Sequence, residues 1–121
     1  MRSDLLVTVA SNRAGDARAI LLPFSLAHTG LAIILSWNPS GLEDSSVQLA
    51  IAAWTVLGSL WSAMTMDGVI ADIGAAAKDM DEEMASSHFG RNWAKVPFSA
   101  LRAVSFIMVV LIVLAELMAI Y

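Results

Sequence analysis

The sequence has no cysteine, and only 15% of its 121 residues are charged. The missing cysteine excludes disulfides, thiol catalysis and iron–sulfur ligation. A soluble domain usually carries about a quarter charged residues, whereas this chain is 58% hydrophobic. It also lacks a phosphate-binding loop, a G-x-S-x-G motif and an H-E-x-x-H motif. We therefore expect a membrane protein that is not an enzyme.

The chain contains three long apolar runs, at residues 19–37, 47–66 and 104–121. A helix needs ~20 apolar residues to cross the ~30 Å hydrocarbon layer of a bilayer. Backbone groups in lipid must be paired within their own segment, and these runs do not alternate polar and apolar residues as barrel strands do. The predicted fold class is an all-α membrane protein with transmembrane helices at 19–37, 47–66 and 99–121.

All seven basic residues fall in segments that can lie on one side of a membrane. Short loops rich in Lys and Arg stay on the cytoplasmic side, so we expect an N-in, C-out protein of a bacterial inner membrane. The short outer link 38–46 carries only Glu43 and Asp44 as charges. Residues 1–18 are expected to form a cytoplasmic arm, broken by the SNRAGDAR stretch at 11–18. The basic residues are Arg2, Arg13, Arg18, Lys78, Arg91, Lys95 and Arg102.

Residues 67–98 predict a cytoplasmic extension of the second helix. Apolar residues recur at helical spacing from Val69 to Met84, with acidic residues on the other faces. We expect an amphipathic acidic helix that ends near Gly90. The RNWAKVPF stretch at 91–98 is typical of an interfacial anchor. We expect the segment to dock partner subunits through Asp79, Asp81, Glu82, Glu83, Arg91, Trp93 and Lys95.

Small and polar residues form a stripe on each of the first two predicted helices. Helices in lipid associate through close backbone approach and through hydrogen bonds between such residues, so we expect the stripes to face each other. Pro23 is expected in the opening turns of the first helix, where proline costs least. Glu116 is expected near the outer boundary, in contact with water. The stripes contain Ser25, Thr29, Ala32 and Ser36 on one helix, and Thr55, Gly58, Ser59 and Ser62 on the other.

His28 is the side chain best suited to specific chemistry within the apolar runs. It lies nine residues before Trp37, ~13 Å by helical rise, and ionisable residues at such depth often mark function. This spacing resembles the alpha polypeptides of purple-bacterial light-harvesting complexes, although Phe24 stands where those usually have alanine. The resemblance implies that His28 ligates haem or a (bacterio)chlorophyll. The alternative is a neutral histidine hydrogen-bonded to a neighbouring helix.

Trp54 and Trp61 are one heptad apart and share a face of the second helix, away from the interfaces. They predict contact with a protein neighbour, a carotenoid or another large apolar ligand, or ordinary packing against lipid. The stretch from Trp61 to Asp72 resembles the second helix of succinate dehydrogenase membrane anchors, which implies quinone contact. In those anchors a haem-ligating histidine stands where this chain has Trp61.

The functional expectation is a small accessory subunit of a membrane-embedded electron-transfer or photosynthetic complex. Three helices enclose little volume, so we expect the chain to work with larger integral membrane subunits and lipids rather than as a monomer. The net charge of −4 disfavours a nucleic-acid partner. Two alternatives stay open. One is a subunit that bears haem or (bacterio)chlorophyll on His28, or a quinone-contacting membrane anchor, and the other is a homo-oligomeric channel or holin-like pore.

Overall fold

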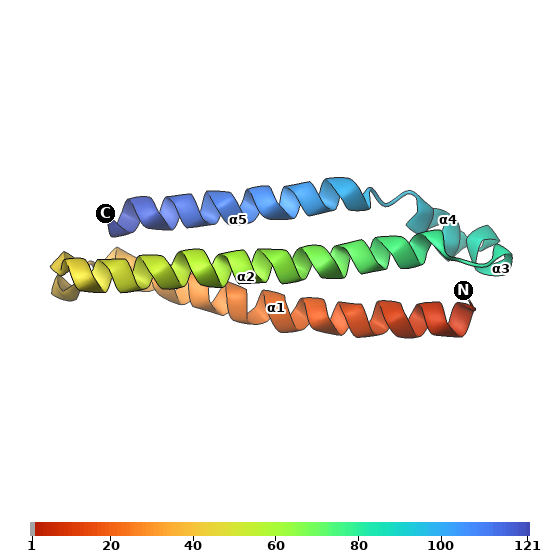
Figure 1. The fold of residues 1–121 in the computed structure, drawn as a ribbon, viewed down its shortest axis with the longest axis horizontal. Coiled ribbons are helices and arrows are strands. Elements are labelled where there is room, and N and C mark those ends of the chain that lie inside the picture. The colour runs from red at the N-terminus through yellow and green to blue at the C-terminus, as the bar shows by residue number, and fades with distance from the viewer. Residues whose placement is uncertain (1) are drawn as a thin grey trace.

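The computed structural model describes residues 2–121, which form an elongated helical bundle (Figure 1). Its long helices are each long and apolar enough to cross a membrane, which confirms the all-α class with three candidate spans. They are α1 (Ser3–Trp37), α2 (Ser45–Lys78) and α5 (Phe98–Ile120).

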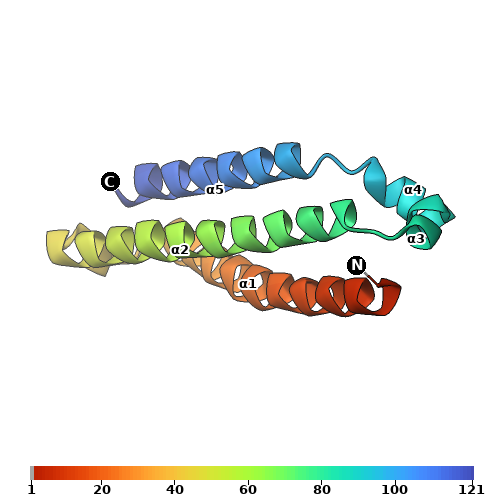
Figure 2. The same cartoon turned by 45° about the vertical axis from the view of Figure 1, so that its right-hand side comes forward.

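Short elements fill the two connections. A 3-10 turn, η1 (Ser40–Glu43), joins α1 to α2. At the other end, α3 (Glu82–Ser86) and α4 (His88–Ala94) lie between α2 and α5. We call residues 79–97, which contain these two helices, the cap. The N-terminal end of α1 lies beside the cap, whereas the C-terminus lies toward the η1 end (Figures 1 and 2).

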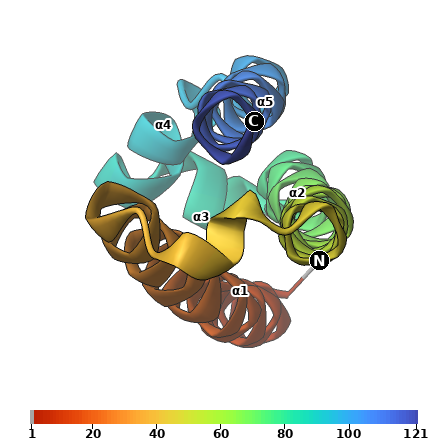
Figure 3. The same ribbon diagram turned by 90° about the vertical axis from the view of Figure 1, so that its left-hand side faces the viewer.

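The central helix is α2, which packs against both α1 and α5, while α1 and α5 contact each other little. Seen end-on, the three long helices stand at the corners of a triangle (Figure 3). Small side chains let the neighbours of α2 approach closely. The buried residues along α2 include Ala52, Ser59, Ala63, Val69 and Ala76.

The expected break in the first helix is wrong, because α1 runs without interruption for 35 residues. Arg13 and Asp16 pair at 2.9 Å across one turn, within the stretch 11–18 that was expected to break. Pro23 lies deep inside α1 rather than in its opening turns. A proline removes one backbone hydrogen bond, and membrane helices tolerate that loss where neighbouring polar groups or local backbone adjustments satisfy the freed carbonyl.

Helix α2 begins at Ser45 and is capped by Asp44. The Asp44 carboxylate accepts hydrogen bonds from the backbone N–H of Ser46 at 2.8 Å and from its hydroxyl at 2.6 Å. This satisfies one of the free N–H groups at the start of the helix. The acidic link therefore has a structural use at the η1 end.

The predicted acidic helix does not continue to Gly90, because α2 ends at Lys78. Asp81 begins a new helix instead, since its carboxylate accepts the backbone N–H of Met84 at 2.8 Å. Such a local side-chain bond competes with continued helix. Gly90 is an internal residue of α4 rather than a helix stop.

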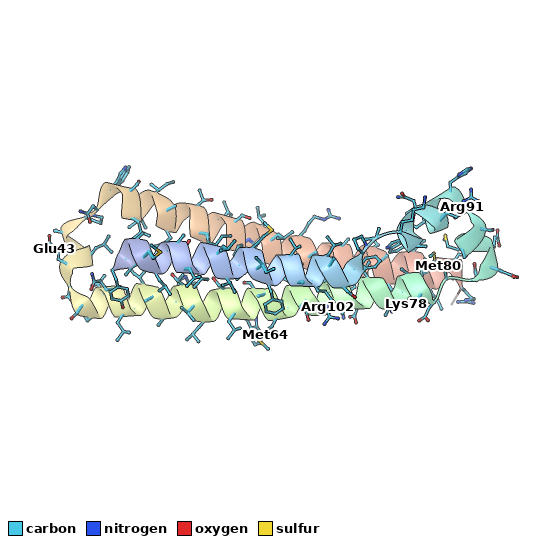
Figure 4. All side chains as sticks on the ribbon, turned by 90° about the horizontal axis from the view of Figure 1, so that it is seen from above. Glu43, Met64, Lys78, Met80, Arg91 and Arg102 are labelled. Atoms are coloured by element: carbon cyan, nitrogen blue, oxygen red, sulfur yellow. The ribbon has the colours of Figure 1, made fainter. Side chains whose placement is uncertain are left out.

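The charged residues are distributed unevenly along the length of the bundle. Figure 4 shows Lys78 and Arg91 at the cap end and Glu43 at the opposite end. Between Ser46 and Met66 helix α2 has no charged residue, a length of ~30 Å by helical rise. That matches the hydrocarbon thickness of a bilayer. The basic residues gather toward the cap end, and which membrane side this end faces stays a prediction.

Candidate functional site

A polar cluster joins all three long helices inside their apolar part. The Nδ1 atom of His28 on α1 lies 2.6 Å from Oε1 of Glu116 on α5. Its Nε2 atom lies 3.1 Å from Oγ of Ser59 on α2. One neutral tautomer satisfies both contacts, with Nδ1–H donating to the carboxylate and the Ser59 hydroxyl donating to Nε2. We call these three residues the His28 cluster.

Neighbouring side chains fix the orientation of the His28 ring. Phe24, one turn earlier on α1, contacts the ring with centroids 4.1 Å apart and planes tilted by 46°. The side chains of His28 and Glu116 are only 15% and 10% exposed. Ser59 is 2% exposed. The cluster is therefore built into the core of the bundle.

Glu116 is buried, so the expectation that it reaches water is wrong. The C-terminal end of α5 packs against the start of α2, where Gln48 donates from Nε2 to the carbonyl oxygen of Ile120 at 3.1 Å. This places Glu116, one turn earlier, against the two other helices rather than at an open end. Its Oε2 atom is buried and has no hydrogen-bond partner within the described chain. A buried carboxylate oxygen without a partner is costly.

Both ring nitrogens of His28 are engaged by neighbouring helices. An axial ligand needs a free nitrogen lone pair, so ligation through Nε2 would require that atom to leave Ser59. No group of three or more His, Cys, Asp or Glu side chains within residues 2–121 could hold a metal ion. The geometry matches the alternative in which His28 bonds to neighbouring helices, and cofactor ligation by His28 stays a prediction.

The small-residue stripe of α2 is buried or partly buried, whereas that of α1 is exposed. Thr55 and Ser59 are buried, and Gly58 and Ser62 are partly buried. The Ser36 hydroxyl donates to the carbonyl of Ile33 in its own helix at 2.7 Å, so it needs no facing partner. The expectation that the stripes face each other is wrong for the α1 residues that are exposed, which are Ser25, Thr29, Ala32 and Ser36.

Two adjoining grooves follow the seam between α1 and α2. The first has a volume of about 690 Å³ and is lined by His28 and Trp54 among mostly apolar side chains. The second, about 610 Å³, lies closer to the cap and is lined by Trp61. Trp54 and Trp61 are 73% and 71% exposed, so each stands at the open side of its groove. Both grooves are lined by Pro23, Phe24 and Ser62.

The cap keeps most of the predicted docking residues at the surface. Asp81 is half-buried because its carboxylate also accepts the hydroxyl of Ser3 at 3.0 Å. The backbone N–H of Met84 and the Ser3 hydroxyl hold the pKa of Asp81 below its ordinary value. Trp93 is half-buried against Phe89, edge to face, with centroids 5.0 Å apart. The exposed members are Asp79, Glu82, Glu83, Arg91 and Lys95.

Comparisons with protein-family models, curated proteins and solved structures find no match to this chain. The two family resemblances noted in the sequence are therefore supported only by the short stretches around His28 and from Trp61 to Asp72. What bears on function is the geometry of the described residues.

Proposed function

We propose that this chain is a small, non-catalytic accessory subunit that docks through its cap onto a larger integral membrane complex. The observation that carries the proposal is the cap itself, in which residues 79–97 fold into two helices between α2 and α5. Antiparallel helices in bundles are commonly joined by only 2–8 residues. A longer, folded connection at the end of a small bundle indicates a surface with a use of its own.

Specific contacts hold the cap in one shape. The Ser87 hydroxyl accepts the backbone N–H of Gly90 at 3.0 Å and thereby caps α4. Gly90 packs so tightly on α3 that a Cβ atom there would lie 2.0 Å from the carbonyl oxygen of Met84. Asp81 caps α3 and ties it to the start of α1 through Ser3. These contacts make the cap an ordered surface rather than a flexible linker.

The chemistry of the cap surface suits a protein partner. Phe89 is 57% exposed, with the carboxylates of Glu82 and Glu83 exposed on α3 and Arg91 exposed on α4. Aromatic and arginine side chains are enriched in protein interfaces, and a polar rim surrounds them. Opposed charges set the register between partners. We infer that the partner offers basic residues opposite Glu82 and Glu83.

The His28 cluster supports a structural role for the bundle. Its bonds link α1, α2 and α5, and its ring nitrogens are used within the chain. Such a cluster is suited to holding helices together in one arrangement. The class of complex, electron-transfer or photosynthetic, is the finer part of the proposal. It rests on the sequence pattern around His28, and the identity of the partner will decide it.

Site-specific photo-crosslinking in native membranes tests the proposal. A photoreactive residue replacing Phe89 should form an adduct with one larger membrane protein. The same residue replacing Trp37, which is 81% exposed at the η1 end, should not form that adduct. Glu82→Lys with Glu83→Lys should abolish the adduct and co-purification, whereas Glu43→Lys should leave both intact. No adduct at Phe89, together with migration as a lone 12.9 kDa species in mild detergent, refutes the proposal.

A further inference from the structure

The two grooves along the α1–α2 seam adjoin each other, because both are lined by Pro23, Phe24 and Ser62, and we call the pair the channel. Their lining on α1 runs from Ala19 to Ile34 within the apolar run, ~22 Å by helical rise. Two glycines, which have no side chain, leave space open in the seam. A Cβ atom added at Gly30 or Gly58 would meet nothing within 4 Å.

The channel offers an apolar wall to an occupant. Two of its hydroxyls are already satisfied by the protein: Ser59 bonds to His28, and Ser62 donates to the carbonyl of Gly58 at 2.9 Å. The Oγ1 atom of Thr55, which also lines the first groove, is buried without a hydrogen-bond partner in the described chain. Trp54 is largely exposed beside them. Such a wall matches an acyl chain, which makes close van der Waals contacts with it when it leaves bulk lipid.

The end of the channel nearest the cap is charged. There the guanidinium of Arg13 bonds to the carboxylate of Asp16 at 2.9 Å and to the carboxylate of Asp72. These three side chains line the second groove and are 40–53% exposed. A headgroup at this position therefore meets one positive and two negative groups.

The charged end lies at the depth of lipid headgroups. Asp67 and Arg102 pair through two bonds of 2.7 and 2.9 Å where the uncharged stretch of α2 ends. Asp72 follows Asp67 by five residues, ~8 Å of helical rise. Headgroup layers extend the ~30 Å hydrocarbon core to ~40–45 Å, so the Asp72 side chain lies in or near such a layer while the channel lies in hydrocarbon.

We propose that the α1–α2 seam binds one zwitterionic aminophospholipid of the phosphatidylethanolamine class. Its acyl chain fills the channel, its phosphate pairs with Arg13, and its ammonium pairs with Asp16 and Asp72. Arginine suits phosphate because its planar fork donates two parallel bonds. An anionic headgroup without an amine leaves two carboxylates facing negative charge, which disfavours it. The inference needs the helices to span a bilayer and does not depend on docking by the cap.

Quenching of tryptophan fluorescence by brominated lipid tests this binding. The reporter protein carries Trp37→Phe and Trp93→Phe, which leaves Trp54 and Trp61 at the seam. It is reconstituted in dioleoylphosphatidylcholine vesicles with increasing fractions of one lipid brominated at its acyl double bonds. Brominated phosphatidylethanolamine should reach half-maximal quenching at a severalfold lower fraction than brominated phosphatidylcholine. Brominated phosphatidylglycerol should show no such advantage.

Variants separate the parts of the site. Arg13→Gln should remove the phosphatidylethanolamine advantage, whereas Arg18→Gln, a matched change at an exposed position outside both grooves, should keep it. Gly58→Leu should fill the channel and remove the advantage at Trp54. Asp16→Asn with Asp72→Asn leaves Arg13 alone and should shift the preference to phosphatidylglycerol.

Several outcomes overturn the proposal. Superimposable curves for the three lipids show that ordinary lipid contacts the seam without selection. A preference for phosphatidylglycerol in the unmodified protein contradicts the charge argument. Equal effects of the Arg13 and Arg18 changes assign the preference to net charge rather than to the site. Circular dichroism of each variant confirms helix content, and the Asp16/Asp72 variant tests the charge argument even if Arg13→Gln does not fold.

Discussion

Replacing either His28 or Glu116 alone should destabilise the bundle more than replacing both with leucine. In the structure these residues are partners at 2.6 Å, and both side chains are mostly buried. His28→Leu leaves the Glu116 carboxylate among apolar helices, where neither oxygen has its donor. Glu116→Leu leaves Nδ1 of His28 without its acceptor. The double replacement leaves only the Ser59 hydroxyl to find a new partner, and a serine can bond to its own helix.

The expected magnitudes follow from these contacts. An unsatisfied buried polar group costs roughly 1–3 kcal/mol, and a charged group costs more. We expect about 1–3 kcal/mol for Glu116→Leu, which strands a neutral ring nitrogen, and a larger cost for His28→Leu, which strands a carboxylate. Hydrogen bonds between membrane helices average ~0.6 kcal/mol and reach ~1.7, and bonds with an ionised partner are about twice as strong. A coupling energy of ~1–3 kcal/mol should therefore appear in the double-mutant cycle.

Reversible unfolding in mixed micelles, followed by tryptophan fluorescence, measures the free energy of unfolding for the four proteins of the cycle. Ser36→Ala is the control, because this exposed residue bonds only to a carbonyl of its own helix. Its change should stay within about 0.5 kcal/mol. A double replacement that costs as much as the two single ones together would show that His28 and Glu116 are not coupled, and would refute the assigned pair.

Two further predictions concern the cap. Gly90→Ala should loosen it by roughly 1–3 kcal/mol, because the new Cβ meets the Met84 carbonyl. Faster amide exchange in α3 and α4 would show this, whereas Gly68→Ala, with open space around it, should leave exchange unchanged. The lowered pKa of Asp81 predicts that its stabilising bonds to Met84 and Ser3 are fully present above the ordinary pKa of 3.8 and are lost as the pH falls through the lowered folded value. Amide exchange of Met84 against pH, with Asp81→Asn as the pH-insensitive reference, measures that loss, and a Met84 profile identical in both proteins contradicts it.

The long helices could be predicted because their signal is local. Apolar length defines each span without reference to the rest of the chain. The break expected at residues 11–18 was wrong because asparagine, glycine and aspartate are only weak helix breakers. Contacts with the rest of the bundle hold this part of α1: Leu6 is fully buried before the stretch, and Arg13 within it pairs with Asp72 of α2. Packing decides helix formation more than propensity does.

The partner of His28 could not be predicted from the sequence. Glu116 lies 88 residues away, and its depth depends on how far α5 is displaced along α2, which the cap determines. The end of α2 was missed for a different reason. Helical periodicity continues from Val69 to Met84, but it does not report the local bond by which the carboxylate of Asp81 starts a new helix. The first error concerns a relation between distant elements, and the second concerns a local helix cap.

The length of α2 beyond its uncharged stretch has a mechanical consequence. From Asp67 to Lys78 the helix adds ~16 Å by rise, and α1 runs alongside it until Ser3 bonds to Asp81 at 3.0 Å. Two helices that are joined at their ends bend less than one, so α1 and α2 together form a stiff support for the cap. With the long helices across a bilayer, the cap would be held at a set height above the lipid surface. The partner that we propose would then need an extramembrane part that reaches this height, which a protein confined to the bilayer lacks.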